Sequence, residues 1–176
     1  MLPIIIPERE YFDNSLQEFV LIKEQKLMLE HSLISISKWE SKWKKPFLDK
    51  AEKTQAESAD YVRCMSIGKE IDSVTLQFIP PEAYRKINDY IADSMTATWF
   101  NERNKKPGPA QVITSELIYY WMIKFGIPVE FEKWHLNRLL TLIKICEVKS
   151  KPQQKIKRKD IYARNMALNA ARKQQF

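Results

Sequence analysis

The residues with the widest chemical repertoire in this sequence are two histidines, His31 and His135, and two cysteines, Cys64 and Cys146. None of them has metal-type spacing, and His135 and Cys146 would lie about 16 Å apart on one straight helix. The apolar surroundings of His135 predict a buried, hydrogen-bonded side chain and not a metal ligand. Each cysteine sits in a helical pattern as a small apolar residue, which is typical of a reduced, cytosolic setting. A pairing of Cys64 with His31 stays open.

The acidic residues give one match to a catalytic pattern. Asp13 followed by Glu24-Gln25-Lys26 imitates a nuclease-type metal site, in which two carboxylates hold Mg²⁺ and the lysine offsets charge. The string Glu40-Ser41-Lys42 matches equally well, so the pattern has little specificity. Three scattered glycines cannot build a phosphate-binding or dinucleotide-binding loop. We therefore expect no enzymatic activity, no cofactor and no metal.

Positive charge is concentrated at the C-terminal end of the chain. Residues 149–176 hold nine of the 29 Lys and Arg residues and one of the 22 acids, so the first 148 residues are almost neutral. Such a segment attracts an acidic protein or nucleic acid by counterion release, or it keeps the protein soluble. The candidate partner-binding residues of this segment are Lys155, Lys157, Arg158, Lys159, Arg164 and Arg172.

Length and composition are those of one ordinary domain with an appendage. The 176 residues are 44% hydrophobic and 29% charged, which suits a packed core with a soluble surface. We expect no secretory segment, because the apolar start is short and flanked by Pro3 and Pro7. No stretch approaches about 18 consecutive apolar residues, so no membrane partner is expected.

The N-terminal residues favour strands. Ile4-Ile5-Ile6 is a β-branched run, a turn-type cluster occupies residues 13–15, and apolar residues resume at Phe19. This pattern predicts a small antiparallel sheet around the 13–15 turn. The alternative is a helix through residues 16–30, whose Glu, Lys, Gln, Leu and Met also favour helix.

From residue 33 the apolar period becomes helical. Ser37 and Glu40 have the spacing of a capping box, and Gly68 is a candidate helix cap after a second helix that begins near Asp49. Pro81 is placed to begin a third helix, and residues 69–79 are predicted to form a loop or a short extended link before it. The expected helices thus cover residues 37–45, 49–67, a stretch that starts at 80–82 and includes Ile91, 114–125, about 129–147 and 158–174.

Four segments resemble a family of small tailed-bacteriophage proteins encoded among tail-assembly genes. The family is associated with tail assembly chaperones, which bind the long tape-measure protein and help tail-tube subunits polymerise around it. The resemblance therefore implies the tape-measure and tail-tube proteins as partners. It implies no catalytic residues. The matching segments are His31–Trp43 (HSLISISKWESKW), Met95–Phe100 (MTATWF), Thr114–Cys146 and Ala163–Arg172 (ARNMALNAAR).

A chaperone for a long helical protein must cover apolar helical stripes, so exposed aromatic faces suit that role. Trp121, Trp134 and Leu139 read mostly as core. The candidate surface residues are Trp39, Trp43 and Trp99, because they lie amid Lys, Ser and Thr.

The expected fold is α+β and mainly α: a small N-terminal antiparallel sheet, a helical core and a basic C-terminal helix. Residues 1–148 form one globular domain, with a β-rich start at 1–32 and a helical core at 33–148, and residues 149–176 form a basic linker and helix. The expected function is a non-enzymatic phage tail assembly chaperone in the host cytoplasm. The alternatives are a structural neck or tail component of the virion and a nucleic-acid-binding protein acting through its basic tail. Self-association is a further option.

Overall fold

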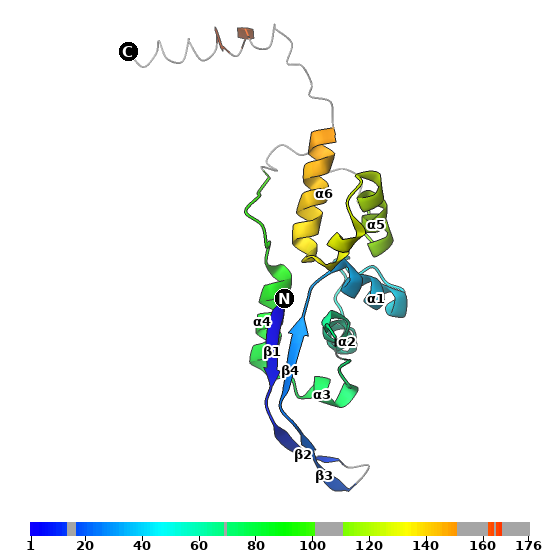
Figure 1. The fold of residues 1–176 in the computed structure, drawn as a ribbon, viewed down its shortest axis with the longest axis vertical. Coiled ribbons are helices and arrows are strands. Elements are labelled where there is room, and N and C mark those ends of the chain that lie inside the picture. The colour runs from blue at the N-terminus through cyan, green and yellow to red at the C-terminus, as the bar shows by residue number, and fades with distance from the viewer. Residues whose placement is uncertain (14–16, 69, 101–110, 151–161, 164, 167–176) are drawn as a thin grey trace, which may run out of the picture. The chain divides into compact units, whose positions relative to one another are not determined.

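The computed structural model describes residues 1–176 except 14–16, 69, 101–110, 151–161, 164 and 167–176 (Figure 1). The chain divides into two compact units, Met1–Cys146 and Glu147–Phe176. Helices predominate and the strands are confined to the N-terminus, so the predicted α+β, mainly α class is confirmed. Of the expected C-terminal helix, residues 162, 163, 165 and 166 are described, and they are helical.

The described residues among the first 29 form the two antiparallel ladders of a β-hairpin, which confirms the predicted sheet over the helical alternative. Its elements are β1 (Leu2–Ile6), β2 (Arg9–Asp13), β3 (Glu18–Ile22) and β4 (Gln25–Leu29). β1 pairs with β4 and β2 with β3, both antiparallel and with the same register offset. The two ladders are separated by two residues in each strand. Pro7 stands at this break, and proline has no backbone N–H to contribute to a ladder.

The hairpin turns a different face towards the protein at each end. In the β1–β4 ladder, Ile4 and Leu27 are buried on one face. By strand alternation the same face of the β2–β3 ladder carries Phe12 and Phe19, which are exposed, while Ile22 on the other face is buried. Two-stranded ribbons twist strongly, so the buried face changes along the hairpin.

Helix α1 (Leu33–Trp43) begins earlier than the sequence predicted. Its N-cap is Ser32, whose Oγ accepts a hydrogen bond from the backbone N–H of Ser35. The predicted capping box of Ser37 and Glu40 is wrong, because Ser37 lies inside the helix and Glu40 is turned inward. The helix ends at Trp43, and the C-cap Lys44 adopts the left-handed conformation with φ 54°.

Helix α2 (Gln55–Met65) begins six residues after the predicted start at Asp49. Thr54 and Glu57 form a true capping box, which fixes this start. The helix ends at Ser66 and not at Gly68, because residues 65–67 pair with the hairpin: Glu30 N–H donates to Met65 O, and Ile67 N–H donates to Met28 O. The expected link at 69–79 contains a short helix, α3 (Ser73–Gln77), capped by Asp72.

The remaining helices are α4 (Pro81–Ala92), α5 (Ser115–Lys124) and α6 (Leu136–Ser150). Pro81 begins α4 and Thr114 caps α5, as predicted. The single helix expected over 129–147 is wrong: a 3₁₀ helix, η1 (Val129–Lys133), precedes α6. The chain is extended at Trp134 and makes an isolated bridge between His135 and Ser32, and this interrupts the helix.

One apolar core joins the hairpin to the helices of the first unit. α4 packs beside β1, while α1 contacts both α2 and α5 (Figure 1). Glu40 ties three segments together, since its carboxylate accepts from Phe47 N–H at 2.7 Å and from Ser115 N–H at 2.8 Å. The largest fully buried side chains are Trp39, Ile6, Leu27, Leu29, Leu33, Ile36, Met65, Ile87, Ile118, Met122, Leu136 and Leu139.

Candidate functional site

A groove of about 1100 Å³ is bounded by α1, α2, α3 and α4. Its apolar lining comes from Trp43 on α1, alanines on α2, Leu76 on α3 and Tyr84 on α4. Polar side chains from α2 and α3 complete its walls. The lining residues are Lys42, Trp43, Gln55, Ala56, Ser58, Ala59, Asp60, Arg63, Leu76, Gln77 and Tyr84.

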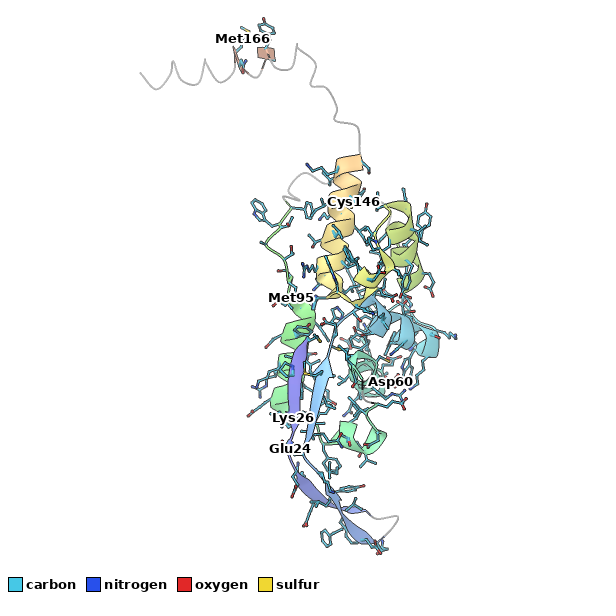
Figure 2. The ribbon with its side chains drawn as sticks, in the orientation of Figure 1. Glu24, Lys26, Asp60, Met95, Cys146 and Met166 are labelled. Atoms are coloured by element: carbon cyan, nitrogen blue, oxygen red, sulfur yellow. The ribbon has the colours of Figure 1, made fainter. Side chains whose placement is uncertain are left out.

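Asp60 organises one wall of the groove (Figure 2). Its carboxylate accepts hydrogen bonds from Lys42 Nζ at 2.6 Å and from Trp43 Nε1 at 2.8 Å, and it pairs with Arg63 Nη2 at 2.6 Å. Burial acts to raise the pKa of Asp60, but the bonds from Lys42 and Trp43 and the charge of Arg63 outweigh it and lower the pKa. Asp60 is therefore a carboxylate that holds two cations and an indole in place.

A second hollow of about 420 Å³ adjoins the groove, because Lys42 and Arg63 line both. Lys38 and Cys64 also face it. Burial and the nearby Asp60 raise the pKa of the Cys64 thiol, although the surrounding cations oppose this shift. A thiol with a raised pKa is a weak nucleophile at neutral pH, so this hollow offers positive charge more than reactivity.

The three candidate surface tryptophans occupy three different environments. Trp39 is 1% exposed and donates from Nε1 to the backbone oxygen of Glu57 at 2.9 Å, so its prediction as a surface residue is wrong. Trp43 is half-buried, stacks on Trp39 with ring centroids 6.2 Å apart, and lines the groove. Trp99 is 80% exposed, as predicted for a surface aromatic. It lines a separate hollow of about 440 Å³ beside α6.

The basic candidates of the C-terminal segment lie outside the described residues. These are Lys155, Lys157, Arg158, Lys159, Arg164 and Arg172.

The two histidines meet in the core. His31 Nδ1 lies 2.5 Å from the Tyr61 hydroxyl, and the rings of His31 and His135 are 5.1 Å apart between centroids. His135 Nε2 donates to Tyr90 O at 2.9 Å, which confirms the predicted buried, hydrogen-bonded histidine. Burial and the neighbouring His135 lower the pKa of His31 to about 3.

The nuclease-type pattern does not assemble. Asp13 pairs with Glu18 in the distal ladder, and Glu24 lies six residues further along the hairpin, about 20 Å from that position. Glu24 and Lys26 are exposed on the hairpin (Figure 2). Among the described residues, no group of three or more His, Cys, Asp or Glu side chains could hold a metal ion.

Exposed apolar residues also occur away from the groove. Phe12 and Phe19 form an edge-to-face ring pair with centroids 5.2 Å apart on the distal hairpin, next to exposed Leu21. Tyr120 and Ile123 are exposed on α5. Both patches are small, but each presents apolar side chains without cover from the rest of the first unit.

Comparison with known proteins adds no relative: no protein family, curated protein or solved structure matches this chain. Within the described ranges, no helix has the length and apolar character that crossing a membrane requires.

The sequence did not predict the groove, because four separate helices build it. One signal was present, since residues 38–45 contain four lysines at helical spacing around the two tryptophans. Their pattern shows a basic outer face on α1. Only the packing of α2 against α1 shows that this face borders a hollow.

Proposed function

We propose that this protein is a non-enzymatic phage tail assembly chaperone that binds a helical segment of the tape-measure protein. The sequence resemblance names the family and the partner. The observation that carries the proposal is the groove between α1, α2, α3 and α4, because it combines an open apolar floor with polar walls. This is the form in which proteins bind amphipathic helices.

The size of the groove suits a helix. An α-helix about 10 Å across occupies about 420 Å³ per turn. A hollow of about 1100 Å³ therefore takes about two and a half turns if they are fully enclosed, and more if one face stays in solvent. The small side chains of Ala56 and Ala59 line the groove on α2 and allow a second helix to approach closely.

The polar groups around the groove support binding over catalysis. Asp60 accepts from three donors, and Glu57 accepts from Lys45 Nζ at 2.6 Å while it completes the capping box of α2. These contacts lower the pKa of both carboxyl groups, which makes them weak bases at neutral pH. These carboxylates instead hold the walls in position.

The direct test is co-expression of the full chain with the tape-measure protein of its phage. A chaperone keeps that partner soluble and co-purifies with it. Insoluble tape-measure protein in the presence of abundant, folded chaperone would rule the proposal out.

A structural role in the virion is the second candidate. This role is supported by exposed apolar residues outside the groove, such as Phe19 at 74% and Ile123 at 80% exposure. Apolar and aromatic side chains of this kind are typical of subunit interfaces. Mass spectrometry of purified particles separates the two roles. A chaperone is abundant in the infected-cell lysate and absent from virions, whereas a component is present in virions at stoichiometric amounts.

A further inference from the structure

The outer face of α1 is basic because its acidic residue points inward. Lys38 and Lys42 are exposed, while Glu40 is 7% exposed and bonded to two backbone N–H groups. Lys38 and Lys42 are four residues apart, so they lie one helical turn from each other, about 6 Å along the axis. They line the adjoining hollow with Arg63.

The counter-charges near this face are fewer than its cations. Asp60 is shared by Lys42 and Arg63, and Lys38 has no ion pair within the part of the chain that the structure describes. Glu70 is the carboxylate that lines the hollow itself, whereas Asp60 lines the neighbouring groove. Lys38, Lys42 and Arg63 thus face two carboxylates, Asp60 and Glu70. Of these, Asp60 is buried and already pairs with Lys42 and Arg63.

We infer that the groove and the adjoining hollow together bind an acidic amphipathic helix. The apolar stripe of that helix packs on Trp43, Leu76 and Tyr84, and its flanking carboxylates, spaced one turn apart, pair with Lys38, Lys42 and Arg63. This inference rests on the proposed function and adds the chemistry of the bound segment. Asp60 is a positioning residue, since it aligns Lys42, Arg63 and the Trp43 indole on one wall.

A protein helix fits this surface better than nucleic acid does. Single-stranded nucleic acid is bound by several open aromatic platforms along a positive groove. Here Trp43 is half-buried, stacked on Trp39 and hydrogen-bonded to Asp60, so its ring is partly covered. Aliphatic Ala56, Ala59 and Leu76 instead match the ridge of a helix.

The test uses the full chain and two synthetic helical peptides of about 20 residues, long enough to form a helix in a groove. Both carry the same Leu/Ala stripe, and their flanking positions are Glu in one peptide and Lys in the other. Fluorescence anisotropy of the labelled peptides measures Kd. We expect the Glu peptide to bind more tightly than the Lys peptide, with an affinity that falls as the salt concentration is raised.

The charge variant Lys38→Gln with Arg63→Gln is expected to weaken binding of the Glu peptide roughly three- to thirtyfold, as expected for loss of two partly exposed ion pairs. The matched control is Arg85→Gln with Lys86→Gln, which removes the same charge from α4 outside the groove lining and is expected to change Kd less than about twofold. A second control, Lys157→Gln with Arg158→Gln, measures attraction by the basic tail. An equal loss in either control, or equal affinity for the Lys peptide, overturns the inference.

The outcomes separate this inference from the proposed function. Soluble tape-measure protein together with no preference for the Glu peptide would keep the chaperone role and refute the acidic-helix chemistry. Selective binding of the Glu peptide with insoluble tape-measure protein would do the reverse. Displacement of the Glu peptide by single-stranded DNA, lost in the Lys38 and Arg63 variant, would reassign the surface to nucleic acid.

Discussion

The rings of His31 and His135, the two histidines of the sequence, lie edge to face with their centroids 5.1 Å apart. His31 follows the hairpin and precedes α1, whereas His135 directly precedes α6. Leu136 N–H donates to His31 O at 2.7 Å at the same point. The contact therefore joins the N-terminal hairpin to the last helix of the first unit.

Acidification is expected to destabilise the protein through His31. The pKa of His31 is lowered from 6.5 to about 3 in the folded state. Between these two pH values the unfolded chain binds a proton at His31 and the folded chain does not. The resulting stability is fully present above pH 6.5 and is lost progressively as the pH falls from 6.5 towards 3, by about 1.4 kcal/mol per pH unit. Urea unfolding at about pH 7.5 and about pH 5 should differ by about 2 kcal/mol from this group.

The control for this pH dependence is His31→Gln, which keeps a polar side chain and removes the titration. It should be less stable at neutral pH but should lose less stability between the two pH values. The lowered carboxyl pKa values of Glu57 and Asp60 interfere little, because the stability linked to them is lost mainly below about pH 5. An unchanged pH dependence in the variant would show that His31 is not the sensitive group.

Replacement of the buried Glu40 on α1 is expected to lower the free energy of unfolding strongly. Glu40→Ala removes the acceptor for Phe47 N–H and Ser115 N–H and should lower the free energy of unfolding by about 2–4 kcal/mol. Glu40→Gln keeps one acceptor oxygen and should cost about half as much. Urea denaturation measures both against Glu52→Ala, an exposed acid whose loss should stay within about 0.5 kcal/mol. Similar values for the three variants would refute the bridging role of Glu40.

Trp39 and Trp99 should respond in opposite ways to truncation. Trp39→Ala opens a cavity in the core and leaves Glu57 O without its indole donor, so a loss of about 3–5 kcal/mol is expected. Trp99→Ala should change stability by less than about 0.5 kcal/mol, because its ring is 80% exposed. Thermal or urea unfolding of the two variants decides this. Comparable losses would mean that the two environments have been assigned incorrectly.

The change of buried face along the hairpin predicts a contrast between neighbours. Ile22→Ala should cost about 2–4 kcal/mol, since Ile22 is 7% exposed, whereas Leu21→Ala should cost less than about 1 kcal/mol at 48% exposure. Equilibrium unfolding of both variants tests the twist directly. If Leu21→Ala were the more damaging change, the distal ladder would face the other way.

The sequence predicted the elements better than their ends. The β-branched run Ile4-Ile5-Ile6 and the turn-type residues at 13–15 predicted the hairpin, and Pro81 and Thr114 marked two helix starts that the structure confirms. The first two helices were misplaced at their starts because several Ser, Thr and Asp residues there are competent caps. A tertiary contact favours Ser32, where the chain bridges to His135, whereas a local capping box with Glu57 selects Thr54.

The candidate site was less accessible from the sequence. Trp39 and Trp43 have the same polar neighbours in the chain, yet α2 covers the first and leaves the second beside the groove. The burial of a helix face depends on which other helix packs against it. The residue pattern of α1 does not show where α2 packs. The basic residues of 155–172 stay a prediction, since they fall outside the described residues.

The most direct test of the account fills the groove without disturbing the fold. Ala56 is exposed and lines the groove, so Ala56→Trp should block a docked helix while the protein keeps its stability; Ala51→Trp, also exposed but outside the groove lining, is the matched control. The measurement is the amount of tape-measure protein that co-purifies with each variant. We expect full recovery with the wild type and Ala51→Trp, and at least about a tenfold loss with folded Ala56→Trp. Equal recovery with all three proteins would contradict the claim that the groove is the binding site.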